Sequence, residues 1–434
     1  MSLTLIAGGG MAGLYAALKI LKRNPRARVL VVERSRHLGG RVWPIRFEGM
    51  DVAGGAGIGR LSKDRRLMRL VRELKVPHRI FRHRVNYAGT HRRSLLASRK
   101  KVAEWQRKLE AARPSLLAAT MERRPSFRQF AISVLGARDA RRMVEVLGFG
   151  DDQEADALDT LDRYGLEDNY DLGKGVSIPW RKLVNAMANK IRSYPNATIR
   201  LGVGLHKFEV IQGDAALSPG RSRRRPCSFV ATLRGSSSSS PLPPLPCSRI
   251  ILALPAHATA AILSRVSKGM GTSTTAVSRL IRSNVKSQSF MLAYARLEKE
   301  DAARLSARVP YYTVTGGVMQ KILPMDAKRG VFMVAYADNA NAKRIHALRS
   351  CRALMRLVSH RLGYETPLRS TSCRFRFIRH GTHYYTPGTW QNRQRFVSTL
   401  HNLLPRNVHL VGEAFSLHQG WVEGALQSVS DAKF

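Results

Sequence analysis

The stretch that decides the fold is residues 3–13, LTLIAGGGMAG, at the start of the chain. Its first residues are β-prone and mostly apolar, and Gly8, Gly10 and Gly13 follow in the pattern G-x-G-x-x-G. The helix-patterned run LYAALKIL comes directly after them. In such a strand–turn–helix unit, the first glycine allows a tight turn and the second lets a pyrophosphate approach the backbone. The third lets the helix pack closely on the sheet. The stretch therefore predicts a dinucleotide site, in which the backbone of Met11 and Ala12 would also face the ligand.

The next segment supports a Rossmann-type unit. Residues 28–33, RVLVVE, form a second apolar run that ends on Glu33. A carboxylate about 20 residues beyond the glycines is placed to bind ribose hydroxyls, and it disfavours a 2′-phosphate. The alternative interpretation is a glycine-rich turn in some other α/β protein, but that would not require the second strand or its terminal acid.

The run that follows distinguishes between dinucleotides. Residues 33–41, ERSRHLGGR, are not required by a nicotinamide site, and they resemble the second glycine motif of the flavin-containing amine oxidase family. In that family the motif lies along the FAD pyrophosphate and ribityl chain, which implies contacts from Arg34, Gly39, Gly40 and Arg41. Residues 51–59, DVAGGAGIG, resemble the next element of the family, a small-residue turn that passes close to the flavin. The FAD contacts implied there are Gly54, Gly55 and Ala56.

The other end of the chain carries a matching motif. Residues 410–426, LVGEAFSLHQGWVEGAL, resemble the closing motif of the family. There a Gly-Glu pair contacts the pyrophosphate and ribitol, and a final helix aims its positive N-terminal end at the flavin edge that gains negative charge on reduction. The FAD contacts implied here are Gly412, Glu413, Gly420, Trp421, Val422 and Ala425.

The middle of the chain resembles the family more loosely. Residues 173–191 are similar to a glycine-rich turn leading into a helix, and residues 198–211 to a strand pair near adenine, with Leu205 where the family usually has valine. Residues 248–258 resemble a strand that returns under the cofactor. The resemblance implies an α/β fold, with a Rossmann-type FAD-binding domain of the amine oxidase type interleaved with an α+β substrate domain. We expect the FAD-binding domain at 1–85, 172–262 and 376–434, the substrate domain at 86–171 and 263–375, and a flexible basic, Ser/Pro-rich insert at 213–247.

The resemblance also implies a reaction. An FAD-dependent enzyme of this type oxidises the C–N bond of an amine by hydride transfer to flavin N5, with O₂ as acceptor. No cysteine stands in a flavin-attachment motif, so we expect non-covalent FAD. Two aromatic rings often confine the amine in relatives; Trp421 would be one, and Tyr384, Tyr385 or Trp390 the other. The alternative for each is an ordinary core aromatic.

The sequence departs from the family at one catalytic position. Many members place a lysine on a sheet strand, where a bridging water reaches flavin N5. In residues 284–297, NVKSQSFMLAYARL, Lys286 is close, but the best frame puts Ser289 or Phe290 at the lysine position. Oxidation by O₂ would then be slow, another acceptor would be used, or catalysis would be lost. FAD-dependent desaturation of a larger ring, as in protoporphyrinogen oxidase, is a further alternative.

The charge of the chain is not explained by amine oxidation. The chain has 73 Lys and Arg against 30 Asp and Glu, a formal net charge of +43. The electrostatic field of such a positive charge favours the binding of polyanions. Residues 92–101 and 221–225 are candidate contacts for non-specific nucleic acid binding. The alternative is that the excess only reflects the base composition of the source genome. Residues 151–171 hold nine of the chain's acidic residues. They could form an entrance that attracts cationic amines, or they could be a solvated face. They lack the glycine of an EF-hand loop, so calcium binding is not expected.

Other features bear on location. Residues 320–342 resemble amine oxidase homologues carried by large DNA viruses, which implies a packaged, basic protein of a virus particle. The second function hypothesis is therefore a flavin-binding, catalytically weak or inactive structural protein that associates with nucleic acid or partner proteins. We expect no membrane span, no signal peptide before the first strand, no anchoring tail and no metal site. The four cysteines are widely spaced, so reduced thiols and an intracellular, cytoplasmic or nuclear, location are expected, with pairing of Cys227 and Cys247 as the alternative.

Overall fold

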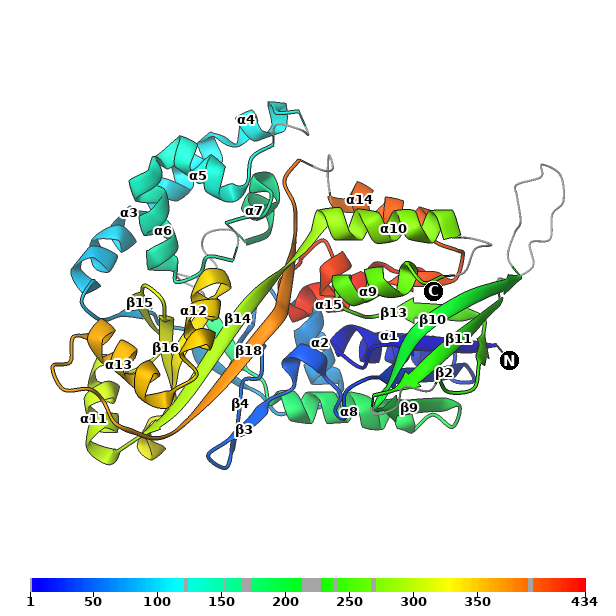
Figure 1. Ribbon diagram of the computed structural model, residues 1–434, viewed down its shortest axis with the longest axis horizontal. Coiled ribbons are helices and arrows are strands. Elements are labelled where there is room, and N and C mark those ends of the chain that lie inside the picture. The colour runs from blue at the N-terminus through cyan, green and yellow to red at the C-terminus, as the bar shows by residue number, and fades with distance from the viewer. Residues whose placement is uncertain are drawn as a thin grey trace.

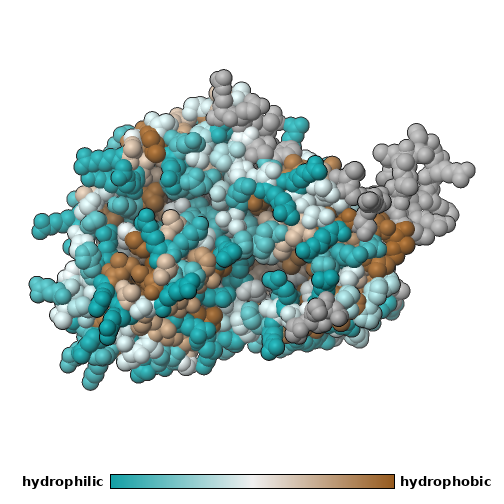
Figure 2. All heavy atoms as spheres, viewed as in Figure 1, coloured by the Kyte–Doolittle hydropathy of each residue, from teal (hydrophilic) through white to brown (hydrophobic). Residues whose placement is uncertain are grey.

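The computed structural model describes residues 2–120, 124–151, 153–164, 173–212, 228–236, 241–266, 271–388 and 393–434. Figure 1 shows two parts that are joined by two long strands, and both chain ends lie in the part that holds the first helix. Figure 2 shows hydrophilic side chains projecting across much of the same face. No helix in the described ranges is long and apolar enough to cross a membrane.

A five-stranded parallel sheet organises the first part, and its strands come from both ends and the middle of the chain. Side chains on successive residues face opposite sides, and both sides are covered: Ile6 and Val31 enter one core, while Leu5 and Leu30 enter another. Burial on both faces explains why these strands are continuous apolar runs. In sheet order the strands are β19 (Val408–Leu410), β13 (Arg249–Leu252), β1 (Leu3–Ala7), β2 (Arg28–Glu33) and β9 (Ala197–Leu201).

Helices cover one face of this sheet, and a second sheet with three helices covers the other. The first group comprises α1 (Met11–Arg23), α2 (Arg65–Glu73), α8 (Trp180–Arg192) and α15 (Val422–Asp431). The second face carries α9 (Ala256–Leu263), α10 (Gly271–Asn284), α14 (Arg393–Asn402) and an antiparallel sheet of β10 (Val203–Gln212), β11 (Ser228–Gly235) and β12 (Leu245–Cys247).

This antiparallel sheet corrects the prediction of an unpacked loop at 213–247. Within that range, β11 pairs with both β10 and β12, and Phe229 and Ala231 are fully buried. The short apolar run SFVATL is β-prone, but the Ser, Pro and Arg residues around it led to the prediction of a loop. Residues 213–227, with the basic run 221–225, lie outside the described residues.

The second part is built on a six-stranded sheet with helices on both sides. Its strands, in sheet order, are β18 (Ser370–Tyr385), β14 (Val285–Leu297), β17 (Val331–Asp338), β16 (Gln320–Asp326), β15 (Thr313–Gly316) and β7 (Asn86–Tyr87). One core contains α11 (Lys299–Arg308), α12 (Asn339–Leu348) and α13 (Cys351–Leu362). The other contains α3 (Arg92–Ala111), α4 (Arg113–Ala118), α5 (Phe127–Leu135), α6 (Ala137–Leu147) and α7 (Ala157–Tyr164).

Short elements connect the two parts. They are the hairpin of β3 (Ile45–Phe47) and β4 (Met50–Val52), and a three-stranded sheet of β5 (Gly59–Arg60), β8 (Lys174–Ser177) and β6 (Arg79–Arg82). Two single-turn helices, η1 (Gly40–Val42) and η5 (Glu413–Phe415), lie in the segments that were predicted to contact the cofactor. The long strands β14 and β18 pair with each other along most of their length, and Figure 1 shows them crossing from one part to the other.

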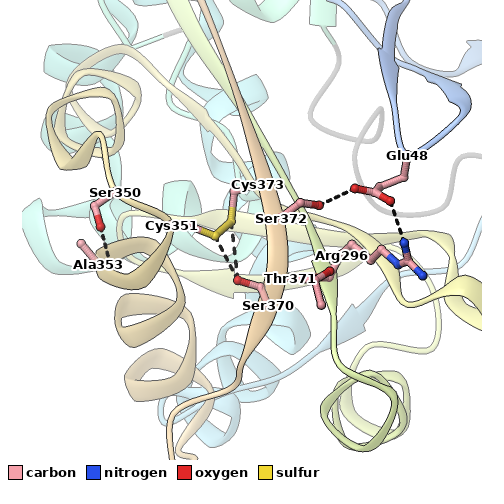
Figure 3. Close-up of a disulfide and its surroundings, with 9 residues drawn as sticks. All are labelled: Glu48, Arg296, Ser350, Cys351, Ala353, Ser370, Thr371, Ser372 and Cys373. Carbon is pink, nitrogen blue, oxygen red and sulfur yellow. Dashed lines mark hydrogen bonds and ion pairs between the residues drawn. A yellow bond between two sulfur atoms is a disulfide. The ribbon is translucent and has the colours of Figure 1, made fainter.

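A disulfide corrects the prediction of reduced thiols. Cys351 of α13 is bonded to Cys373 of β18, with Cα atoms 5.7 Å apart, and the Ser370 hydroxyl lies 3.0 Å from the Cys351 sulfur (Figure 3). Widely spaced cysteines gave no sign of this pairing, because only the packing of α13 against the sheet brings them together. Cys247 is free and buried, and Cys227 lies outside the described residues.

Candidate functional site

A pocket of about 890 Å³ runs between the two parts of the molecule. Nearly all the residues predicted to contact the cofactor line it, although they come from both ends of the chain. The exception is Gly13. The lining residues that were predicted are Gly8, Gly10, Met11, Ala12, Glu33, Arg34, Gly39, Gly40, Arg41, Gly54, Gly55, Ala56, Leu205, Gly412, Glu413, Gly420, Trp421, Val422 and Ala425.

The three glycines of the first turn have different surroundings. A Cβ atom on Gly13 would lie 1.9 Å from the carbonyl oxygen of Gly8, and one on Gly8 would lie 2.4 Å from the carbonyl oxygen of Ala253. A Cβ atom on Gly10 would meet nothing within 4 Å. Gly8 and Gly13 are thus required for packing, whereas Gly10 borders open space in the pocket. This open cradle at the N-terminus of α1 fits the pyrophosphate of a dinucleotide.

Glu33 lies at the carboxyl end of β2, beside the same turn. Its Oε2 accepts a hydrogen bond from the Gly9 amide at 2.7 Å, and its Oε1 accepts from the amide and hydroxyl of Ser35 at 2.8 and 2.7 Å. These bonds fix the carboxylate at the pocket wall, where it can accept from ribose hydroxyls. Arg34 also lines the pocket.

Two small-residue segments pack against each other without room for side chains. A Cβ atom on Gly55 would lie 2.1 Å from the carbonyl oxygen of Arg41, and one on Gly54 would lie 2.0 Å from that of Trp43. The backbone of Gly39 and Gly40 is left-handed, with φ of 92° and 54°. The glycines therefore let two backbone segments form one continuous wall of the pocket.

Glu413 joins three segments of the wall. Its carboxylate accepts hydrogen bonds from Arg41 Nη1 at 2.8 Å, from the amide and Nδ1 of His383 at 2.7 and 2.9 Å, and from the Gly420 amide at 2.9 Å. Burial alone would raise the pKa of Glu413. His383, Arg41 and the hydrogen bonds outweigh that effect and hold the pKa well below its ordinary value.

The closing helix presents Trp421 to the pocket in a fixed orientation. The indole Nε1 donates to the buried carboxylate of Asp64 at 2.9 Å, and the ring meets Trp180 edge to face with centroids 6.2 Å apart. Next to it, the carboxylate of Glu423 accepts from the amides of Arg66 and Leu67 at the start of α2. Trp421 is thus both a pocket residue and a well-anchored one.

The far end of the pocket is lined by aromatic side chains that the sequence interpretation did not single out. Phe149 follows α6, Tyr312 precedes β15, and Tyr336 lies on β17. Phe149 and Tyr336 meet edge to face at 6.0 Å, and Phe290 of β14 lies 6.2 Å from Tyr336. Asp151 also lines this end, and burial together with nearby acids raises the pKa of Tyr336 and Tyr312. The antiparallel pairing of β14 with β17 brings Phe290 and Tyr336 together, whereas Phe149 and Tyr312 reach them from loops distant in the chain.

A buried lysine lies behind these rings. Lys321 of β16 is fully buried, and its Nζ, which has no hydrogen-bond partner, lies 2.9 Å from the ring centroid of Phe149 and 4.3 Å from that of Tyr336. Burial lowers its pKa to about 7, although Asp338 and Asp151 act in the opposite direction. A bulge at Gln320 and Lys321 redirects the strand here, as bulges beside active sites often do.

Two predicted catalytic residues do not reach the pocket lining. Lys286 is exposed, and its Nζ donates to the carbonyl oxygen of Arg282 at 2.7 Å. Tyr384 is its cross-strand neighbour on β18 and is not among the residues that line the described pocket. Phe290, the alternative to Lys286 in the sequence frame, does line it, whereas Ser289 is buried against Asn339. Tyr385 donates to Ala414 and Ser416 in the core, and Trp390 lies outside the described residues.

The chain was compared with known proteins. A family model described as "NAD(P)-binding Rossmann-like domain" matches residues 6–74. No curated protein matches. Among solved structures, a single-substitution variant of putrescine oxidase superimposes with a TM-score of 0.71 at 15% identity, over 99% of this chain and 97% of that one. Wild-type putrescine oxidase bound to putrescine matches over the same shares at the same identity, with a TM-score of 0.70.

These findings define the class of fold. The chain is a mixed α/β protein with a parallel Rossmann-type sheet, and it has the fold of putrescine oxidase over almost its entire length. At 15% identity this similarity concerns the fold, and the chemistry must be argued from the pocket. Within the described ranges, no three His, Cys, Asp or Glu side chains gather as a metal site.

Proposed function

We propose that this chain is an FAD-dependent oxidoreductase of the amine oxidase type, which oxidises the C–N bond of an amine. The observation that carries the proposal is the continuity of one pocket. It begins at the open glycine cradle of Gly10, passes the Arg41–Glu413 pair and ends among Phe149, Tyr312 and Tyr336. Such a pocket can hold a dinucleotide along its length and a small substrate at its aromatic end.

Each part of the cofactor has suitable residues. The Gly10 turn and the N-terminus of α1 suit the pyrophosphate, Glu33 suits the ribose of the adenosine, and the N-terminus of α15 suits the flavin edge. FAD supplies the redox chemistry, namely hydride acceptance at N5 and reoxidation by O₂. Among the described cysteines, Cys247 is buried in the core and Cys351 and Cys373 form a disulfide, so none of these three is available for attachment, which supports non-covalent FAD.

The aromatic end suits an amine. The faces of Phe149 and Tyr336 attract cations, and the Asp151 carboxylate lines the same end of the pocket. Lys321 lies behind the same rings, and burial lowers its pKa to about 7; in its protonated form it opposes a second positive charge and so favours the neutral amine, which is the form that can lose a hydride. The putrescine-bound structure of the same fold is a further support for an amine substrate.

Two measurements test the proposal in sequence. Protein refolded or expressed with FAD should keep a flavin absorption band after gel filtration; colourless protein would contradict the dinucleotide site. The flavin should then bleach anaerobically when putrescine, spermidine or benzylamine is added. Trp421→Phe keeps an aromatic ring but loses the bond to Asp64, so it should bleach more slowly while it still retains FAD.

A second candidate is a flavin-binding protein that is catalytically weak or inactive and acts as a structural or packaged component. The observation in its favour is Phe290, which lines the pocket and is one of the two residues, with Ser289, that the sequence places at the lysine position of many relatives. Yellow protein that no amine bleaches would support this candidate. Association with nucleic acid, an intracellular location and packaging in a virus particle remain predictions within it, and ring desaturation is tested by the same bleaching assay with a porphyrinogen.

A further inference from the structure

Two histidines of the pocket wall are stacked on each other. The rings of His257 and His380 have centroids 3.8 Å apart and planes inclined by 26°. His257 lies in the first turn of α9, and His380 lies on β18, next to Gly381, whose carbonyl oxygen accepts from Arg41 at 2.8 Å. Both rings line the pocket, and neither has a role in the proposed oxidation.

The pair lies close to the predicted pyrophosphate position. The connection from β13 to α9 packs on the glycine turn, since the carbonyl oxygen of Ala253 would be only 2.4 Å from a Cβ atom on Gly8. His257 follows this connection at the start of a helix, and Arg34 and Arg41 line the same pocket. The histidines therefore belong to the stretch of wall that a dinucleotide phosphate group would pass.

Without a bound anion, the surroundings keep the rings of His257 and His380 neutral. Burial, together with the charges of His380, His383, Arg34 and Arg41, lowers the pKa of His257 to about 4. The pKa of His380 is also lowered, by burial first and then by His383, Arg379 and Arg41. Two charged rings at this separation would repel each other, so the neutral pair can take up one further proton at most.

The acidic side chains that line the pocket interact with groups other than the two histidines. Glu413 accepts from Arg41 and His383, and Glu33 accepts from Gly9 and Ser35. Asp151, the remaining acid of the pocket lining, acts on the tyrosines and on Lys321 at the aromatic end. From β14, the hydroxyl of Ser287 lies 2.7 Å from His380 Nδ1 and is neutral. An anionic ligand would therefore bring the negative charge that this part of the wall lacks.

We propose that the stacked pair His257–His380 is an anion site for the diphosphate group of the cofactor, and that the pair takes up one proton when the diphosphate binds. The anion reverses the electrostatic balance, because it favours the charged form of a ring that burial and the neighbouring arginines keep neutral. The identity of the anion as part of FAD rests on the proposed function. The proton uptake is a property of the histidines and can be tested without catalysis.

Calorimetric titration of the cofactor-free full chain with FAD at pH 6, in two buffers of different ionisation enthalpy, measures the protons taken up. We expect uptake that approaches one proton, and an affinity that weakens by up to about tenfold per pH unit as the pH rises. His257→Gln should abolish most of the uptake and the pH dependence. His91→Gln, an exposed histidine before α3, should change neither.

Inorganic pyrophosphate and adenosine separate this inference from the proposed function. Uptake with pyrophosphate that is lost in His257→Gln and absent with adenosine supports the anion site, even if FAD is not retained. Binding of FAD or pyrophosphate without proton uptake, or no binding of either, overturns it. His380→Asn serves as the second variant, and circular dichroism shows whether each variant is folded.

Discussion

Glu413 shows how one residue can hold a pocket together. It comes from the closing motif, but its carboxylate accepts from Arg41 near the start of the chain and from His383 on β18. Only 4% of the residue is exposed, so each of these bonds forms in a medium where a charged partner left alone is costly. The sequence indicated a cofactor contact here; the structure adds that the same carboxylate fixes the wall.

We expect Glu413→Gln to lower the free energy of unfolding by about 3 kcal/mol at pH 7, because it leaves Arg41 without its counter-charge and removes a carboxylate acceptor from His383. Urea denaturation of the FAD-free chain measures this loss. Glu48→Gln removes a carboxylate that bonds Ser372 and Arg296 at the surface, and should have a much smaller effect. Equal effects of the two variants would contradict the role of Glu413.

The same variant has a pH signature. Because folding lowers the pKa of Glu413 from its ordinary value of 4.5, its contribution to stability is present above that pH and is lost as the pH falls below it. The wild type should therefore lose more stability than Glu413→Gln between about pH 5 and pH 3. Parallel pH curves from thermal melts would exclude this contribution.

At the level of elements, the β1–turn–α1 unit shows why glycine is needed in two different ways. Gly13 lets α1 approach the carbonyl oxygen of Gly8, whereas Gly10 leaves space that faces the pocket. The sequence pattern predicted both roles, because the turn, the helix and the strand are contiguous. The disulfide between α13 and β18 is different, since it depends on the packing of two elements that the sequence does not align.

The two glycines provide a matched pair of variants. Gly13→Ala should destabilise the fold by about 2 kcal/mol or more, because its methyl group would overlap the backbone of the turn. Gly10→Ala should melt like the wild type but retain FAD at least about tenfold less tightly, because its methyl group occupies the phosphate approach. Thermal melts and flavin fluorescence measure the two effects. If Gly10→Ala loses stability and Gly13→Ala does not, the assignment of packing to Gly13 and of phosphate approach to Gly10 is wrong.

The disulfide predicts a stability difference of its own. Cys351 and Cys373 are separated by 22 residues, so replacing both with serine should cost about 3 kcal/mol of unfolding free energy. Reductant should lower the stability of the wild type towards that of the double variant and leave the variant unchanged. Peptide mapping by mass spectrometry under non-reducing conditions checks the bond, and two free thiols in the folded wild type would disprove it.

At the scale of the whole molecule, the formal charge of +43 is the feature that the fold leaves unexplained. Hydrophilic side chains project over much of the face in Figure 2, and α3 carries exposed Arg93 and Lys100. Some basic residues are neutralised locally, as Lys101 is by Asp139 at 3.8 Å. The remaining excess should attract polyanions without sequence preference.

Salt dependence tests this association. Binding to a DNA duplex should weaken by roughly 10³-fold or more between 50 and 200 mM salt if six or more phosphates are contacted. Arg93→Glu with Lys100→Glu should reduce the affinity and the slope against salt concentration. If the protein does not bind DNA at 50 mM salt, the excess positive charge does not serve polyanion binding.

The sequence by itself determined the elements whose causes are local. The β1–turn–α1–β2 unit follows from residues 3–33, and the matching glycines near residue 412 predicted the second half of the same groove. Tertiary structure decided the rest. His257 of α9 meets His380 of β18, and Lys321 of β16 meets Phe149 after α6, only because elements distant in the chain lie side by side. Lys286 lies at the start of β14, where its Nζ donates to the carbonyl oxygen of Arg282 at the end of α10 and does not reach the pocket. Short-range patterns encode backbone geometry, whereas the pairing of side chains depends on strand register and bulges that no single segment contains.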